Sequence, residues 1–191
     1  MDARETVTSP RLISLLKDLA GDRLNALDNF WQEISIRGAP LVEPIPGNER
    51  DLLVTFLYRS TKDDARIGLV SDLSGRMGDY EAMTLLPGTD VWFISHRLPE
   101  DTRETYQLSI DGQDYLDPFN PEKEVFPVDE DTGFGGWESS VFELPAAPVQ
   151  AWSSPRPGVA TGQASKYYLA SQILGHEYPV WIYTPPGYSP V

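Results

Sequence analysis

The sequence predicts a mainly β protein in which one or two helices precede an antiparallel β-sandwich. Six or seven short segments rich in β-branched and aromatic residues recur between turn-forming residues, which is the pattern of a sandwich. The 15 glycines and 17 prolines among 191 residues favour many short elements over long helices. Hydrophobic residues make up 40% of the chain, which is too many for a disordered acidic polypeptide.

The N-terminal segment, residues 1–39, carries two helical patterns. Ser9 is suited to cap the first helix, Pro10 to occupy its first position and Gly21 to end it. The apolar stripe of this helix consists of Leu12, Ile13, Leu15, Leu16 and Leu19. A second helix is expected from the spacing of Leu24, Leu27, Phe30, Trp31 and Ile34, and it ends before Gly38-Ala39-Pro40.

Residues 40–145 carry the strand patterns of the sandwich. We interpret residues 41–50 as a loop and place residues 66–71 beside residues 52–59. The strands are expected at residues 52–59, 66–71, 91–97, 104–110, 113–116 and 137–144. Asp111-Gly112 predicts the tight turn of a hairpin.

The C-terminal part has a different composition. Residues 146–163 are rich in proline, alanine and serine, which predicts a linker. Residues 165–174 and 178–184 predict a hairpin around Gly175-His176-Glu177. Because two strands alone do not make a stable domain, we interpret residues 164–191 as the truncated start of a second domain. Its uncovered apolar residues predict a homo-oligomer through residues 165–184, packing onto the sandwich, or disorder.

Charge and composition exclude several classes of protein. A formal net charge of −14 argues against nucleic acids and anionic membranes as partners, because binding to either needs a basic face. The lack of cysteine excludes a disulfide scaffold, a thiolate metal site and a cysteine nucleophile. The first 20 residues have no unbroken apolar run typical of a secretory signal, which favours the cytoplasm.

Histidine and acidic residues predict neither a catalytic centre nor a resident metal ion or other cofactor. His96 lies in a strand pattern and His176 in a hairpin turn, so we expect no catalytic role for either. A calcium loop starting at Asp129 would need a glutamate where Ser140 stands. We therefore interpret the acids of this region, including Asp111, Asp114, Asp117 and Asp129-Glu130-Asp131, as solvated loops.

Three parts of the sequence, taken in order along the chain, match an arrangement found in a known family. The first runs from Phe30-Trp31 through Gly38-Ala39-Pro40-Leu41 to Val54–Arg59. The second leads from Leu98-Pro99 and Arg103–Tyr106 to Asp117-Pro118-Phe119-Asn120-Pro121, which we expect to fold as a turn. The third is Val180–Tyr188. Together the three parts resemble the enterochelin esterases, which hydrolyse ferric catecholate siderophores, and the similarity covers about residues 30–191.

This resemblance implies an immunoglobulin-like sandwich followed by an α/β-hydrolase domain that is missing here. The Gly-x-Ser-x-Gly nucleophile motif of that domain does not occur in this sequence, so no catalytic residue is assigned. The resemblance implies that the sandwich is a substrate-recognition or lid domain and that the whole enzyme releases iron from its siderophore in the cytoplasm. We expect this chain alone to be inactive.

The candidate ligand-binding residues follow from the chemistry of an anionic ferric catecholate. Arg59, Arg97 and Arg103 are scarce cations in an acidic domain, although each could instead form a surface salt bridge. Phe134 and Trp137 flank a pair of glycines and are expected to be exposed for stacking on flat rings. Most other rings, such as Trp92, Tyr106 and Trp152, are expected in the core.

Two other functions remain open from the sequence. Immunoglobulin-like sandwiches also occur as glycan-binding modules of carbohydrate-active esterases, in which a row of exposed tryptophan or tyrosine side chains would be expected. A purely structural spacer that orients a catalytic domain is the third interpretation.

Overall fold

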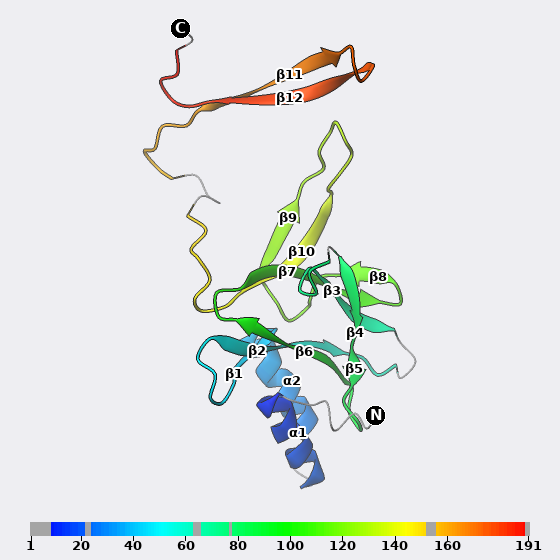
Figure 1. Cartoon of the computed structure of the whole chain (residues 1–191). Helices are drawn as coiled ribbons and strands as arrows, with labels where there is room; N and C mark the ends of the chain where they lie inside the picture. Colours follow the sequence, from blue (N-terminus) through cyan, green and yellow to red (C-terminus); the bar gives the residue numbers. More distant parts are fainter. Residues whose placement is uncertain (1–8, 22–23, 63–65, 77, 152–155, 190–191) are drawn as a thin grey trace. The chain divides into compact units, whose positions relative to one another are not determined.

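The computed structural model describes residues 9–21, 24–62, 66–76, 78–151 and 156–189, and it divides the chain into two compact units (Figure 1). The larger unit comprises Met1–Val128 and Gly135–Pro148, and the smaller comprises Asp129–Phe134 and Val149–Val191. The larger unit consists of antiparallel strands preceded by two helices, which confirms the predicted fold class.

The larger unit contains two antiparallel sheets. The first sheet has the order β1 (Leu41–Pro44), β2 (Asp51–Arg59), β6 (Val91–Pro99) and β5 (Thr84–Leu85). The second has the order β4 (Asp79–Ala82), β3 (Ile67–Ser71), β7 (Arg103–Ile110), β10 (Trp137–Glu143) and β9 (Lys123–Phe126), and β8 (Gln113–Tyr115) also pairs with β7. The tight turn predicted at Asp111-Gly112 joins β7 to β8, and both of its residues have positive φ.

The central strands β2 and β6 are buried on both faces, as their nearly continuous apolar sequences require. Phe56 and Trp92 point into the core between the two sheets, together with Tyr106 of β7. Leu57 and Phe93 point the other way, into a second core that the helices cover. The sandwich is therefore a three-layer structure of helices, first sheet and second sheet (Figure 1).

Helix α1 (Pro10–Ala20) begins and ends where the sequence predicts. The Ser9 hydroxyl caps it by accepting a hydrogen bond from the Leu12 N–H. Glu43 stabilises the same end, because its buried carboxylate accepts from the Ser9 hydroxyl at 2.6 Å and from the Arg11 N–H at 2.8 Å. A carboxylate at this position also interacts favourably with the helix dipole.

Glu43 lies in β1, so the prediction of a loop throughout residues 41–50 is wrong. Pro44 is tolerated in β1 because β1 is the edge strand of its sheet. The second helix, α2 (Ala26–Arg37), begins later than the spacing suggested, and Leu24 precedes it with 89% of its surface exposed.

Strand partners were harder to predict than strand positions. β3 does not lie beside β2, as we expected, but pairs with β4 and β7 in the other sheet. Both edges of β2 are already occupied by β1 and β6. The additional strands β4, β5 and β9 are short, and their residues are half-buried or exposed, so they lack the apolar pattern that reveals a strand.

The smaller unit contains one hairpin, formed by β11 (Gln163–Ser171) and β12 (His176–Thr184). His176 pairs with Ser171 as the first residue of β12, so the prediction that His176 lies in the turn is wrong. Gly175, with φ of 76°, ends the turn instead. Trp152 lies outside the described residues. The exposed large apolar residues of the hairpin are Tyr167, Tyr168, Leu169, Ile173, Leu174, Trp181, Ile182 and Tyr183.

Candidate functional site

The three predicted ligand-binding arginines do not form one cluster. Arg59 and Arg97 lie on the first sheet, where the register pairs Arg97 with Leu53, six residues before Arg59 on β2. That separation corresponds to roughly 20 Å along the strand. Arg103 begins β7 in the second sheet. A single cationic pocket built from all three arginines is therefore not present.

Arg59 is part of a stacked arrangement that joins α2 to the end of β2. Its Nε donates to Asp90 at 2.7 Å, and its guanidinium lies 5.5 Å from the centre of the Trp31 ring. The Trp31 indole also donates to Asp90 and stacks on Phe119 at 5.2 Å. These contacts position the guanidinium firmly and leave about half of the side chain exposed.

Arg103 connects three strands of the second sheet. Its Nε donates to Glu143 of β10 at 2.7 Å, and a terminal NH2 group donates to Glu124 of β9 at 3.1 Å. The bond to Glu143 is the largest of the effects that raise the pKa of Arg103. Because both edges of the guanidinium are engaged, a structural role explains this residue.

Arg97 differs from the other two arginines because it lines a cavity and keeps part of its guanidinium unused. Its Nε donates to Asp51, and no other polar partner of its guanidinium is found in the described residues. The side chain is 64% exposed. The Asp51 carboxylate also accepts from Asn48, and this bond, followed by that from Arg97, lowers the pKa of Asp51.

The cavity beside Arg97 has a volume of about 340 Å³ and mostly apolar walls. It lies on the helix-facing side of the first sheet, next to the start of α1. Besides Arg97, its lining consists of Pro10, Pro44, Ile45, Pro46, Leu53 and Ser95. Arg97 is the one predicted ligand-binding residue found in the lining of the cavities resolved in the described part of the chain.

Trp137 and Phe134 lie at the glycine-rich connection between β9 and β10. Trp137 begins β10 and stacks on Phe126 of β9 with a centroid distance of 5.4 Å, leaving 37% of its surface exposed. Phe134 belongs to the smaller unit and is 66% exposed. Gly135 has φ of 103°, and a Cβ there would clash with the Pro127 carbonyl oxygen, so this turn requires glycine.

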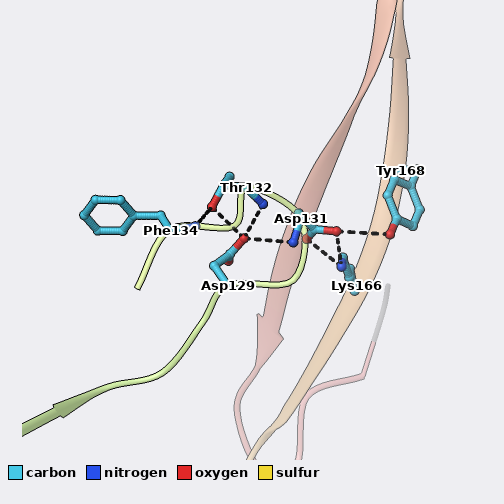
Figure 2. A network of polar contacts seen from close by, with 6 residues as sticks. All are labelled: Asp129, Asp131, Thr132, Phe134, Lys166 and Tyr168. Carbon is cyan, nitrogen blue, oxygen red and sulfur yellow. Dashed lines mark hydrogen bonds and ion pairs between the residues drawn. The ribbon is translucent and has the colours of Figure 1, made fainter. Parts of the chain in front are cut away.

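Polar contacts organise the acidic loop of the smaller unit (Figure 2). One Asp129 oxygen accepts bonds from the Asp131 N–H and from the N–H and hydroxyl of Thr132, and these bonds lower the pKa of Asp129. Asp131 pairs with Lys166 of β11, and this pairing raises the pKa of the lysine. The Tyr168 hydroxyl donates to the same carboxylate. These carboxylates therefore act as structural acceptors.

Asp117, which we expected in a solvated loop, is 2% exposed and belongs to a buried polar network. It accepts from the Tyr106 hydroxyl at 2.8 Å and from the Phe119 N–H. Asn120 donates to the Tyr106 oxygen and to the Val141 carbonyl. Burial is the main cause that raises the pKa of Asp117 and that of Tyr106. The predicted turn at residues 117–121 is confirmed, and its role is structural.

Neither histidine forms a Ser–His–acid arrangement in the part of the chain that the structure describes. His96 lies within β6, not at a strand edge, and its Nε2 is 3.3 Å from Glu81 of β4. His176 packs against Tyr178 at 4.4 Å. The described residues also contain no group of three histidine, aspartate or glutamate side chains arranged to hold a metal ion.

Comparison with known proteins relates the sandwich to one family. Residues 53–114 match the family model described as "Enterochelin esterase, N-terminal". Residues 53–114 are therefore similar to the N-terminal domain of enterochelin esterases. The resemblance predicted from the sequence is thereby confirmed, and the matched region extends from β2 to β8.

Two esterases of iron(III) siderophores are similar in sequence to this chain. The iron(III) enterobactin esterase of Dickeya dadantii is 27% identical over 187 residues, which covers 81% of this chain and 42% of that protein. The iron(III) salmochelin esterase of Escherichia coli O6:H1 is 33% identical over 102 residues, covering 51% of this chain and 24% of that protein. The chain therefore spans less than half the length of the curated relatives it matches.

A solved structure supports the fold. The enterochelin esterase of Shigella flexneri superposes with a TM-score of 0.51 at 20% identity, over 81% of this chain and 44% of that one.

In the described ranges, no helix has the length and apolar character needed to cross a membrane.

Proposed function

We propose that this chain is the substrate-recognition or lid part of an esterase that hydrolyses ferric siderophore esters and thereby releases iron in the cytoplasm. The observation that carries the proposal is the match of residues 53–114 to the enterochelin esterase N-terminal family. The two curated relatives are named as esterases of iron(III) enterobactin and iron(III) salmochelin. These names favour a siderophore over a glycan as the ligand.

The catalytic step belongs, in this proposal, to a hydrolase domain that the hairpin β11–β12 begins. Residues 146–163 are then the linker between the two domains. The exposed apolar residues on both faces of the hairpin would be covered by that domain, since such a surface is rarely left in water. The sequence has no Gly-x-Ser-x-Gly motif, so we expect no ester hydrolysis by residues 1–191 alone.

The recognition chemistry follows from the ligand. A ferric tri-catecholate is a large anion with flat aromatic rings, and the related Shigella flexneri esterase was crystallised in the presence of 2,3-di-hydroxy-N-benzoyl-serine. Guanidinium groups attract the anion, and aromatic side chains stack on its rings. In this chain the candidates for those contacts are Arg59, Arg97, Phe134 and Trp137, whereas Arg103 is already held by Glu124 and Glu143.

Titration of residues 1–191 with ferric enterobactin and with soluble glucans, followed by tryptophan fluorescence, tests the proposal. We expect saturable binding of the ferric siderophore and none of the glucans. Replacing Trp137 by alanine should weaken siderophore binding, whereas Tyr115→Ala, which removes another half-exposed ring, should not. Binding of glucans instead, or of neither ligand, would overturn the proposal and favour the glycan module or the spacer.

An activity assay tests the assignment of the chemistry to another domain. Residues 1–191 should hydrolyse p-nitrophenyl acetate no faster than buffer does. Turnover that survives the double substitution His96→Ala and His176→Ala would contradict this assignment, because it would require a catalytic group that the described residues do not provide.

A further inference from the structure

The cavity beside Arg97 has the size and wall chemistry of a site for one aromatic ring. Its volume of about 340 Å³ lies at the lower end of the range for small-molecule sites, which is too small for three catechol rings around one iron. Pro44, Ile45 and Pro46 of the β1–β2 connection and Leu53 of β2 supply apolar walls. Such walls favour the face of a flat ring over a flexible polar chain.

Arg97 supplies the cavity with directional hydrogen-bond donors. Asp51 holds the guanidinium through Nε, and within the described residues its terminal NH2 groups have no hydrogen-bond partner. A guanidinium presents its donors as a planar fork that matches two adjacent oxygen atoms. An arginine fixed at one edge and open at the other is therefore suited to bind a ligand that carries a pair of oxygens.

The charge of the cavity indicates which ligand it accepts. Among the described residues, Arg97 is the only charged one in the lining, although the Asp51 carboxylate neutralises part of that charge. A second cavity in this unit, of about 450 Å³, is lined by Arg37 but also by Glu122 and Glu143, and a third, of about 470 Å³, has Glu49 beside Arg50 in its lining. That second cavity disfavours an anion, whereas the Arg97 cavity can accept one.

We propose that the cavity lined by Arg97, Ile45 and Leu53 binds a single planar aromatic ring whose edge carries anionic or vicinal oxygens, such as a dihydroxybenzoyl group. The ring contacts Ile45, Leu53 and the prolines, and the oxygens accept hydrogen bonds from the terminal NH2 groups of Arg97. This assignment rests on the proposed function, and it narrows the recognition of a whole siderophore to one ring at one cavity.

Titration of residues 1–191 with 2,3-dihydroxybenzoate, followed by amide NMR shifts, tests the assignment. We expect saturable shifts at Ile45, Leu53 and Ser95, with a Kd of about 1 mM or below. Arg97→Gln should weaken binding about tenfold, because hydrogen bonds to a charged group are lost. Arg97→Lys should recover only part of that loss, because a lysine keeps the charge but lacks the fork.

Two further variants test whether the change in affinity comes from the cavity itself or from the net charge of the chain. Arg76→Gln makes the same change in charge at an exposed position outside the cavity, and it should leave the affinity unchanged. Ile45→Ser should weaken binding about fivefold through loss of an apolar wall, with the arginine intact. Circular dichroism establishes that each variant is folded. Shifts scattered over the surface, or an affinity that Arg97→Gln does not change, would overturn the assignment.

A parallel titration with ferric enterobactin distinguishes this assignment from the proposed function. If the ferric siderophore binds and neither 2,3-dihydroxybenzoate nor the Arg97 variants show an effect, the cavity assignment is wrong and the proposed function stands. If the single ring binds in an Arg97-dependent manner and the ferric siderophore does not bind, the cavity assignment stands and the proposed function is wrong.

Discussion

Replacing Asn120 by alanine tests whether the motif Asp-Pro-Phe-Asn-Pro is structural or binds a ligand. The Asn120 amide donates to the Tyr106 oxygen at 3.0 Å and to the Val141 carbonyl at 2.9 Å, and its oxygen accepts from the Glu122 N–H. Each of the two inner bonds contributes about 1 kcal/mol net, and leaving the Val141 carbonyl without a donor costs about 1 kcal/mol more. The expected loss is therefore about 2–3 kcal/mol.

Urea unfolding followed by far-UV circular dichroism measures this loss, and thermal unfolding should show a Tm about 5–10 °C lower. Asn29→Ala is the matched control, because Asn29 is exposed on α2 and its side chain forms no hydrogen bond with another described residue. Ferric siderophore binding by folded Asn120→Ala should be unchanged. A stability equal to that of the control, or a loss of binding without a loss of stability, would refute the structural role.

Three further outcomes are expected. Glu43→Gln should lower the free energy of unfolding by about 1–2 kcal/mol in urea, because the Ser9 hydroxyl at the N-terminus of α1 loses its carboxylate acceptor. An unchanged urea midpoint would contradict this. Burial raises the pKa of Asp117 above its ordinary value of 3.8, so the folded state binds this proton more tightly than the unfolded state does. The stability therefore falls as the pH rises from the unfolded-state pKa toward the raised folded-state pKa. Asp117→Asn should remove this part of the pH dependence above about pH 4, and parallel stability curves for the two proteins would count against it. Sedimentation velocity should show that the chain self-associates through its exposed hairpin. The double variant Leu169→Glu and Ile182→Glu should reduce this self-association. A wild-type chain that stays monomeric at high concentration would refute the prediction.

The sequence predicted the elements with strong local signals. Ser9, Pro10 and Gly21 delimit α1 because capping depends on neighbouring residues alone. The strands at residues 51–59, 91–99 and 103–110 were found because apolar residues recur along each of them, such as Tyr106, Leu108 and Ile110 on one face of β7. Strand partners depend on contacts distant in sequence, so the place of β3 in the second sheet did not follow from its residues.

The candidate site was predictable only in part. The sequence could single out Arg97 as a scarce cation, but the cavity beside it depends on the packing of Pro10, Ile45 and Leu53, which come from three separate segments. Charge alone could not reveal that Asp117 is buried, because its partners Tyr106 and Ser140 lie on other strands. An aspartate followed by proline in a predicted turn was the one available signal.

Equilibrium dialysis of residues 1–191 against ferric enterobactin is the most direct test of the central proposal, which is that this chain by itself recognises a ferric siderophore. The coloured ferric complex should accumulate on the protein side to one equivalent at saturation. The combined variant Arg97→Gln and Trp137→Ala should retain much less of it than Arg76→Gln does. Equal distribution of the complex across the membrane, at protein concentrations far above those needed for fluorescence, would contradict the claim.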